Sequence, residues 1–215
     1  MDGNRRWAKE HGVSSLEGHK RGYEVFKQTI QDAKDLGVQN MIFYAFSTEN
    51  WGRTEKEVSY LLDLMQKGFE DLDVVHKNEL QIRFVGERER FSKKLQDSMA
   101  DLEEKTKGYT NGLVAIALSY GGRAEILHAV NELIKEGKKE PVTEEEFSDR
   151  LWTAGIPDPD LVIRTGEAMR LSNFLPWQSV YSELYFTATY WPDFDKEEFA
   201  YILEEFSNRE RRMGT

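Results

Sequence analysis

Short apolar runs alternate with longer helix-like stretches along most of this chain, and this alternation constrains its fold more than any other feature. The apolar runs lie at residues 41–46, 80–85, 113–118, 161–163 and 181–186. Helix-like patterns lie at about 19–36, 55–72, 91–106 and 123–135, and again from about 196. Strands that alternate with helices favour a mostly parallel central sheet with helices on both faces. We therefore expect residues 1–215 to form a single α/β domain.

Polar side chains follow several of the apolar runs. Asn50, Arg123 and Arg164 each come directly or shortly after a run that we expect to form a strand. In parallel sheets the ligand site lies outside the carboxyl ends of the strands. The pattern therefore predicts that these three side chains lie on one rim of the sheet.

The charge balance narrows the ligands that such a rim could bind. The 215-residue chain has a formal net charge of −10, which argues against general binding to nucleic acids. Any anion must therefore be held by a local group of arginines. The chain has no cysteine, so disulfides, thiolate metal sites and cysteine nucleophiles are excluded.

Membrane-spanning and export segments are not evident in the sequence. No apolar run approaches the ~20 residues that span a bilayer, and the charged N-terminus lacks a signal-peptide core. We therefore expect a cytoplasmic protein that is at most associated with a membrane surface.

The N-terminal run combines one carboxylate with a glycine and two arginines. Its members are Asp2, Gly3, Asn4, Arg5 and Arg6, with His19 further along the chain. Mg²⁺ often takes only one or two protein carboxylates and completes its shell with water and phosphate oxygens, so Asp2 could supply one ligand. Arginines and backbone amides beside a glycine could bind the phosphate oxygens. The alternative is a frayed, charged N-terminus that begins a helix.

A second polar group follows the run at 41–46. Its members are Ser47, Thr48, Glu49, Asn50, Trp51 and Arg53. So many different polar groups within a few residues are unusual for a plain connection. The alternative is a turn with helix caps, since Ser47, Thr48 and Asn50 are all turn formers.

Two arginines flank a glycine-containing loop after the run at 161–163. Arg164 ends the run, Arg170 follows the loop, and Ser172 lies close by. This arrangement is a candidate second diphosphate site, with a solvated loop as the alternative.

Glu183 lies among apolar neighbours in the run at 181–186. An ionised carboxylate there is costly unless an arginine, a group of donors or a metal satisfies it. Glu183 could pair with Asp2 around one Mg²⁺. A structural Arg–Glu pair is the alternative.

Taken together, these runs resemble the cis-prenyltransferase family, most closely the undecaprenyl diphosphate synthases of bacteria and their archaeal relatives. The matching pieces are MDGNRRWAKEHG, GHKRG, YAFSTENWGR, SYGGR, DPDLVIRT, RLSNFLPWQ, YSELYF, WPDFD and NRERRMG. They follow the family's order over nearly the whole chain.

The resemblance implies a role for each candidate residue. Asp2 and Asn50 would be catalytic, with Asn50 assisting proton removal, and Asp2 and Glu183 would bind Mg²⁺. The allylic diphosphate site would be lined by Gly3, Asn4, Arg5, Arg6, Trp7 and His19. The reaction centre would be shaped by Ser47, Thr48, Glu49, Trp51 and Arg53. Isopentenyl diphosphate would be bound by Arg164, Arg170, Leu171 and Ser172.

The implied reaction is the sequential condensation of isopentenyl diphosphate onto an allylic diphosphate, such as farnesyl diphosphate, with cis double bonds and release of diphosphate. The product would be a long-chain, undecaprenyl-like polyprenyl diphosphate held in an apolar tunnel. The candidate wall residues are Val58, Leu61, Leu62, Leu64 and Met65, although core packing explains such a stripe equally well.

The resemblance also implies partners beyond the substrates. The chain would form a homodimer, and the closing Arg212-Met213-Gly214 would match a family element that reaches the site across the dimer interface. Product release would involve peripheral contact with a membrane.

Four positions depart from the family pattern. The apolar strand that normally precedes the DGN motif is expected to be absent or to lie outside this chain. Ser15 stands where many members have another diphosphate-binding arginine, and Ser119 replaces an asparagine. In the arginine loop, Glu167 and Ala168 replace the usual glycine and glutamate, which adds negative charge and removes backbone freedom.

Two other functions stay open. The altered loop and the missing strand are compatible with a non-catalytic or weakly catalytic partner subunit of a heteromeric cis-prenyltransferase. A generic phosphoester hydrolase could use Asp2 and Glu183 around a metal.

Overall fold

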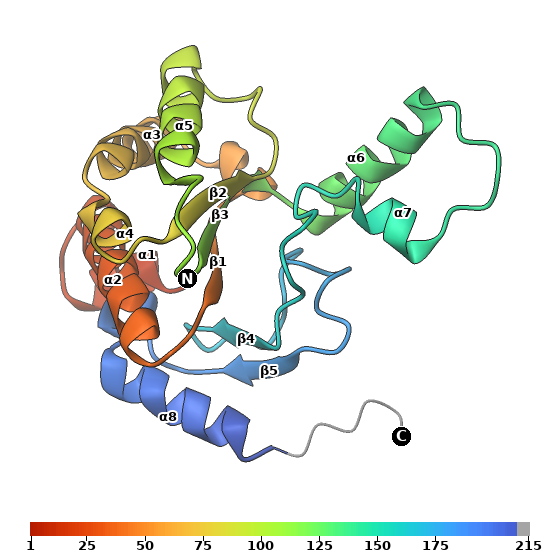
Figure 1. Ribbon diagram of the computed structural model, residues 1–215. Helices are drawn as coiled ribbons and strands as arrows, with labels where there is room; N and C mark the ends of the chain where they lie inside the picture. The colour runs from red at the N-terminus through yellow and green to blue at the C-terminus, as the bar shows by residue number, and fades with distance from the viewer. Residues whose placement is uncertain (210–215) are drawn as a thin grey trace.

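The computed structural model describes residues 1–209, and its helices and strands lie close to where the alternation predicts them (Figure 1). The α-helices are α1 (Asn4–Glu10), α2 (Ser15–Asp35), α3 (Glu55–Glu70), α4 (Asp73–Lys77), α5 (Lys93–Thr106), α6 (Gly122–Lys135), α7 (Glu144–Ser148) and α8 (Lys196–Ser207). The strands are β1 (Asn40–Ser47), β2 (Gln81–Val85), β3 (Leu113–Tyr120), β4 (Leu161–Arg164) and β5 (Glu183–Phe186). Two short 3-10 helices are η1 (Thr48–Gly52) and η2 (Trp191–Asp193).

The strands form two parallel sheets. A three-stranded sheet has the order β1-β3-β2, and β4 pairs with β5 in a two-stranded sheet. The α/β fold with parallel strands is therefore confirmed. Within residues 1–209 the parallel strands are divided between these two sheets, and no strand pairs with the outer edge of β1 or of β4.

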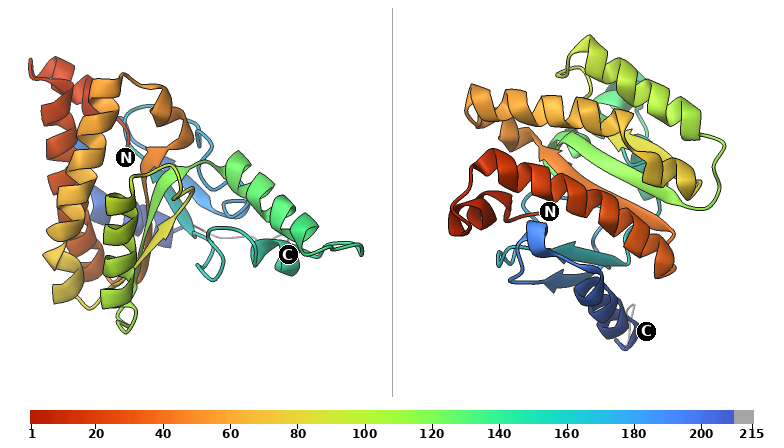
Figure 2. Two further views of the ribbon diagram at one scale, coloured as in Figure 1. Left: turned by 90° about the horizontal axis from the view of Figure 1, so that it is seen from above. Right: turned by 90° about the vertical axis from the view of Figure 1, so that its left-hand side faces the viewer.

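Strand β3 is the centre of the larger sheet, and all of its residues are buried. Helices α2, α3 and α5 lie side by side over one face of this sheet (Figure 2, right). Aromatic rings fill the layer between helices and strands, for example Phe26 of α2 against Phe43 of β1 at 4.7 Å between centroids. A strand that is covered on both faces is apolar along its whole length, which explains why this run showed no alternation.

The opposite face of β3 is covered mainly by the segment between α7 and β5. Ile156 and Leu175 are buried there in a cluster with Tyr120, and Trp152 and Phe174 pack beside them. Helices α6 and α7 stand away from the two sheets (Figure 1), while α8 places Phe199 and Ile202 in the main core.

Helix α1 packs closely on α2 because two glycines of α2 have no side chain. A Cβ atom on Gly18 would lie 2.2 Å from the Asn4 carbonyl oxygen, and one on Gly22 would lie 2.1 Å from the Asn4 Oδ1 atom. The GHKRG run is thus needed to seat the N-terminal segment. No helix within residues 1–209 is both long and apolar enough to cross a bilayer.

A buried carboxylate joins α6 to the segments that cover the sheet. Glu125 is fully buried and accepts hydrogen bonds from the Tyr120 hydroxyl, from the Thr153 amide and hydroxyl, and from the Gln178 amide nitrogen. A buried carboxylate needs such a set of donors to offset its loss of hydration. This network anchors the base of α6.

We expect Glu125→Ala to lower the free energy of unfolding by about 3 kcal/mol, because it leaves several buried donors without an acceptor. Urea denaturation followed by circular dichroism measures this loss. Glu132→Ala on the same helix is the control and should change stability by no more than about 0.5 kcal/mol. Equal effects of the two substitutions would contradict the proposed anchor.

Candidate functional site

A groove of about 1090 Å³ runs between the two sheets, bounded by β1, β4, the segment 170–175 and α8. Its polar end gathers most of the predicted site residues, and the remainder is largely apolar. The predicted residues that line it are Asp2, Asn4, His19, Ser47, Glu49, Asn50, Arg53, Arg164, Arg170, Leu171 and Ser172. Gly3, Arg5, Arg6, Trp7, Thr48, Trp51 and Glu183 are not among the lining residues.

The carboxylate of Asp2 lies at the polar end between two arginines. Its Oδ2 atom accepts a hydrogen bond from Arg164 Nη2 at 3.0 Å, and its Oδ1 atom lies 3.4 Å from Arg6 Nη2. The Gly3 amide also donates to Oδ1, at 2.7 Å. Partial burial opposes ionisation, but the bonds from Arg164 and Gly3 outweigh it and lower the pKa of Asp2.

The backbone of Asp2 is held as firmly as its side chain. Its amide donates to Thr165 Oγ1 at 2.9 Å, and its carbonyl accepts from the Thr165 hydroxyl at 2.8 Å and from the Trp191 amide at 2.9 Å. These bonds join the chain before α1 to the end of the β4–β5 sheet. The predicted alternative of a frayed N-terminus is wrong in this respect, although α1 does begin at Asn4.

Arg164 is drawn into the site by the segment that follows it. Its Nη1 atom donates to Ser172 Oγ at 2.7 Å and to the carbonyl oxygen of Arg170. Its Nε atom is buried without a hydrogen-bond partner among the described residues, and so is Asn4 Oδ1. Orphaned buried groups beside a groove indicate atoms that a polar ligand or water would satisfy.

Backbone strain is concentrated in the loop after Arg164. Glu167, Ser172, Asn173 and Leu175 all have positive φ, between 48° and 67°. Residues other than glycine adopt this left-handed conformation at an energetic cost, and such strain is often found at binding sites.

The amides of Gly166 and Glu167 bond to the backbone of the segment after β5 and do not form an anion cradle. The Gly166 amide donates to the Thr189 carbonyl and the Glu167 amide to the Thr187 carbonyl. An anion here would therefore be bound by the side chains of Arg164, Arg170 and Ser172.

Glu167 keeps the backbone shape that the usual glycine would have. Its φ is 67°, and its carboxylate lies 3.7 Å from Arg6 Nη1. Arg6 is thus shared between Asp2 and Glu167, and it also lies over the ring of Tyr190 at 5.2 Å. A ligand that binds Arg6 has to compete with two carboxylates.

Asn50 and Ser47 form a helix cap at the start of η1. The Ser47 amide donates to Asn50 Oδ1 at 3.1 Å, and the Ser47 side chain accepts from the Asn50 amide. The turn-and-cap alternative is therefore confirmed for this pair. Asn50 also lines the groove.

The two predicted tryptophans do not line the groove, and each makes a hydrogen bond to another part of the chain. Trp51 donates from Nε1 to Ser119 Oγ at 2.9 Å and packs edge-on against Phe46. Trp7 donates from Nε1 to Asp193 at 2.7 Å. Both indoles therefore support the loops that carry the site. Ser119, with φ of 47°, takes the left-handed shape that asparagine adopts readily.

Glu57 is a site residue that we did not predict. Its Oε1 atom accepts a hydrogen bond from Arg53 Nη1 at 2.9 Å and lies 3.3 Å from His19 Nε2 and 4.0 Å from Arg5 Nε. Burial lowers the pKa of His19, although Glu57 opposes this shift. The only signal was a glutamate four residues after Arg53 at the start of a helix, which is usually read as a surface pair.

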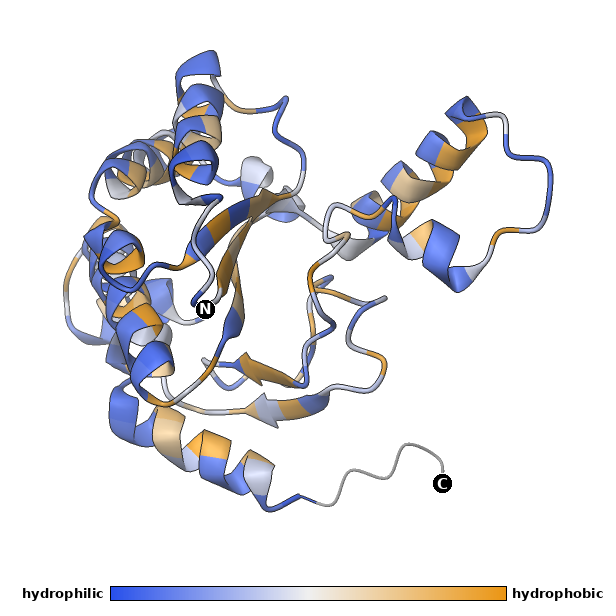
Figure 3. Cartoon of the chain, in the orientation of Figure 1, coloured by the Kyte–Doolittle hydropathy of each residue, from blue (hydrophilic) through white to orange (hydrophobic). Residues whose placement is uncertain are grey.

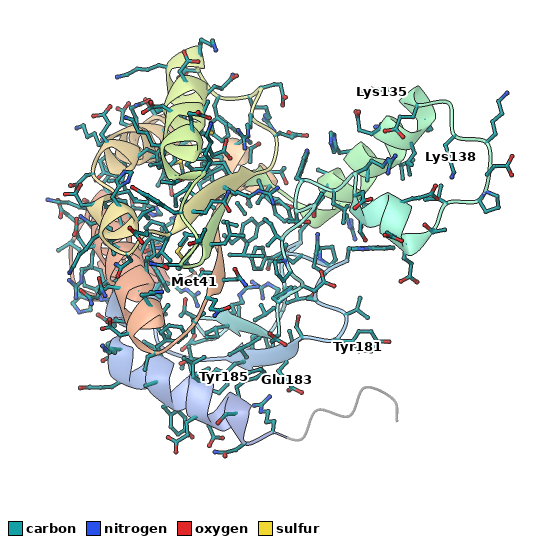
Figure 4. The ribbon with its side chains drawn as sticks, viewed as in Figure 1. Met41, Lys135, Lys138, Tyr181, Glu183 and Tyr185 are labelled. Atoms are coloured by element: carbon teal, nitrogen blue, oxygen red, sulfur yellow. The ribbon has the colours of Figure 1, made fainter. Side chains whose placement is uncertain are left out.

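Glu183 lies at the opposite end of the small sheet from Asp2. It begins β5 opposite Leu161, whereas Arg164, the partner of Asp2, ends β4 opposite Phe186. Its carboxylate accepts from Arg209 Nη1 at 2.8 Å, below β5 in Figure 4. The structure therefore does not bring Glu183 to Asp2, and the alternative of an Arg–Glu pair is what it contains.

The remaining predictions have mixed outcomes. Leu61, Leu64 and Met65 line a second cavity of about 110 Å³, whereas Val58 and Leu62 pack against the core. Ser15 is the first residue of α2. Arg212-Met213-Gly214 lies outside the described residues.

Comparisons with known proteins agree on one family. Residues 1–214 match the Prenyltransf family model, described as "Putative undecaprenyl diphosphate synthase". An isoprenyl transferase of Chromobacterium violaceum is 46% identical over 215 residues, covering 100% of this chain and 85% of the relative. An isoprenyl transferase of Thermotoga maritima is 44% identical over 218 residues, covering 100% of this chain and 94% of the relative.

Solved structures give the same result. A lavandulyl diphosphate synthase from Lavandula x intermedia, in complex with dimethylallyl diphosphate, superposes with a TM-score of 0.95 at 31% identity and covers 100% of this chain and 95% of that one. A probable undecaprenyl diphosphate synthase from Campylobacter jejuni superposes with a TM-score of 0.81 at 34% identity. The match covers 91% of this chain and 93% of that one.

The left-handed backbone at position 167 leads to a test of the loop. We expect Glu167→Gly to be more stable than Glu167→Ala by about 1 kcal/mol, because both lose the weak contact with Arg6 but only glycine adopts positive φ without strain. Thermal melts of the two variants measure the difference. An alanine variant as stable as the glycine variant would show that the loop is not held in this conformation.

Proposed function

We propose that this chain, which belongs to the undecaprenyl diphosphate synthase family, condenses isopentenyl diphosphate sequentially onto an allylic diphosphate with cis double bonds. The observation that carries the proposal is the polar end of the groove, where Asp2, Arg164, Arg53 and His19 converge beside an apolar cavity. Two diphosphates joined to hydrocarbon need this combination of cations and apolar surface.

The allylic diphosphate is assigned to the N-terminal segment. Asn4 and His19 line the groove there, and Arg6 lies next to the Asp2 carboxylate. A structural neighbour solved in complex with dimethylallyl diphosphate supports an allylic diphosphate as a ligand, although not its place in the groove. Isopentenyl diphosphate is assigned to Arg164, Arg170 and Ser172, which meet through the hydrogen bonds of Arg164.

Mg²⁺ fits the donor set around Asp2. The described residues contain no cluster of three or more histidine, aspartate or glutamate side chains that could hold a metal by themselves. A single half-buried carboxylate beside arginines suits a Mg²⁺ ion that takes its other ligands from water and diphosphate oxygens. When bound, the ion would stabilise negative charge on the departing diphosphate. Glu183, 2.8 Å from Arg209, is a less suitable ligand in this conformation.

The chain's own residues would act mainly by charge and position. In each cycle the allylic C–O bond breaks, a bond forms to isopentenyl diphosphate, and a proton is lost from it. Arg6 would stabilise the allylic diphosphate as it leaves, since preorganised cations act most strongly on developing charge. Asn50, which lines the groove, would assist removal of the proton, while Glu57 holds Arg53 and His19 in place.

A homodimer is proposed on a face of α6. Leu127 and Ile134 are 62% and 67% exposed, and Val130 lies on the same face of the helix. Figure 3 shows this apolar stripe on a helix that stands away from the body. Exposed apolar patches of this kind are typical of protein interfaces.

Leu127→Glu should convert the purified protein from a dimer to a monomer, because the dimer would have to bury the new charge at its interface. Analytical ultracentrifugation gives the mass against the 25.1 kDa of a single chain. Glu132→Ala, on another face of α6, should leave the dimer unchanged. A wild-type protein that sediments as a single chain would refute the homodimer.

The activity is tested with purified protein, Mg²⁺, farnesyl diphosphate and labelled isopentenyl diphosphate. We expect lipid-extractable label from the wild-type protein. We expect Asp2→Ala to lower turnover roughly 100-fold or more, because it removes the carboxylate that would hold Mg²⁺ beside the departing diphosphate. The control is Asp101→Ala, an exposed aspartate that pairs with Lys105 on α5.

Two outcomes would contradict the proposal. Label that appears only after a second subunit is added would favour the non-catalytic partner subunit. Phosphate release from the diphosphates without elongation would favour a hydrolase.

A further inference from the structure

The first turn of α6 is capped by a residue that is distant in the sequence. Gly121 stands at the N-cap position and has no side chain that could accept a hydrogen bond. Asn173 takes this role, since its Oδ1 atom accepts from the Arg123 amide at 2.9 Å and its carbonyl oxygen accepts from the Gly122 amide at 2.7 Å. Both amides lack a partner within the helix itself. Asn173 therefore joins the segment 170–175 to the start of α6.

The other end of the Asn173 side chain binds η1, which carries residues predicted for the reaction centre. Asn173 Nδ2 donates to Glu49 Oε1 at 3.1 Å, and Thr48 Oγ1 lies 3.2 Å from Glu49 Oε2 as a second donor. Desolvation opposes ionisation of Glu49, but hydrogen bonds from its own backbone amide and from Asn173 lower the pKa of this carboxyl. Glu49 is therefore an anion that accepts a hydrogen bond from Asn173.

Two glycines after β3 make room for this contact. A Cβ atom on Gly121 would lie 2.7 Å from both Asn173 Nδ2 and Thr48 Oγ1. A Cβ atom on Gly122 would lie 2.0 Å from Pro176 Cδ. Asn173 itself has a φ of 66°, a left-handed conformation that asparagine adopts more readily than most residues. The two glycines and Asn173 thus allow the segment 170–175 to lie against α6 and η1.

The same segment carries residues that we assign to isopentenyl diphosphate. Ser172 directly precedes Asn173, and its Oγ atom accepts from Arg164 Nη1 at 2.7 Å. Phe174 follows and stacks on Tyr44 of β1, with 4.7 Å between the ring centroids. The segment is therefore fixed to the small sheet through Arg164 and to the larger sheet through Asn173 and Phe174.

We propose that Asn173 is a positioning residue that holds the isopentenyl diphosphate site at a fixed distance from the reaction centre. This inference rests on the proposed function. Ser172 and Arg170 are bound to the backbone next to Asn173, whereas Glu49 and Asn50 belong to η1. Loss of the bond between Asn173 and Glu49 would let the two groups shift relative to each other. Condensation is sensitive to such a shift, because reacting atoms must be held within ~3–3.5 Å.

The test separates the bond to Glu49 from the cap on α6. Asn173→Asp keeps an acceptor for the Arg123 amide, and aspartate is as good an N-cap as asparagine. The variant loses the donor to Glu49 and places two carboxylates against each other. We expect its melting temperature to stay within about 3 °C of the wild type.

Binding and kinetics give the readout for position. Isothermal titration with Mg²⁺ present measures the Kd for isopentenyl diphosphate, and steady-state assays measure KM for both substrates. Asn173→Asp should raise the Kd and KM for isopentenyl diphosphate roughly tenfold, through the lost hydrogen bond and the new repulsion. The KM for farnesyl diphosphate should change by less than about twofold, because the allylic site is assigned to the N-terminal segment.

Two further variants show whether the added charge alone is responsible. Asn173→Gly removes the same donor without adding charge or backbone strain, and it should also weaken isopentenyl diphosphate binding. Asn173→Asp combined with Glu49→Gln restores a hydrogen bond with donor and acceptor exchanged. This double variant should bind isopentenyl diphosphate within about twofold of Glu49→Gln alone.

Asn111 offers a matched control. Its Nδ2 atom donates to Glu79 Oε2 at 3.2 Å, so Asn111→Asp also places two carboxylates against each other. Asn111 lies just before β3, whereas α6 begins after the other end of that strand, and it lines neither the groove nor the second cavity. Asn111→Asp should therefore leave the Kd for isopentenyl diphosphate unchanged, even if the melting temperature falls.

The outcomes separate this inference from the proposed function. Wild-type protein that binds isopentenyl diphosphate but makes no product would overturn the proposed function, while the titrations would still test Asn173. Wild-type protein that does not bind isopentenyl diphosphate would overturn both. A folded Asn173→Asp variant with wild-type Kd, or a double variant that binds no better than Asn173→Asp, would overturn the positioning role and leave Asn173 as a helix cap.

Discussion

The hydrogen bonds of Asp2 are the constraint on which the site depends. The two sheets share no strand pair within residues 1–209, and the chain before α1 is bonded to Thr165 and Trp191 through the Asp2 backbone. The same residue presents its carboxylate to Arg164. Position and charge are therefore set together, because a shift of this segment would separate the carboxylate from its arginine and displace α1.

Most arginines of the site are paired with carboxylates close to them, so positive and negative charges nearly cancel there. Arg6 pairs with Asp2 and Glu167, Arg164 pairs with Asp2, and Arg53 pairs with Glu57. A chain with a net charge of −10 can hold an anion only where its arginines converge. Paired carboxylates keep those arginines ordered before the ligand arrives, at the expense of competing with it.

Much of the fold could be predicted because it follows from local patterns. The helices and strands follow apolar periodicity. The expected rim is found only in part, because Asn50 and Arg164 line the groove from two different sheets and Arg123 is not among the lining residues. Pairings between distant segments could not be predicted in this way. The sequence pattern indicates that Glu57 is a surface residue of α3, and the structure pairs it with Arg53 at the site. The pattern indicates that Glu183 is a metal ligand, and the structure pairs it with Arg209. Asn50 shows a third limit, since one side chain can both cap a turn and face a groove.

The bare strand edges along the groove bear on where a hydrocarbon can lie. On the outer sides of β1 and β4, peptide N–H and C=O groups have no strand partner within residues 1–209. A prenyl chain laid against them would strip their water and give no hydrogen bond in return, at a cost of roughly 1–3 kcal/mol for each group. A hydrocarbon in the groove is therefore favoured against its apolar side chains and disfavoured against these strand edges.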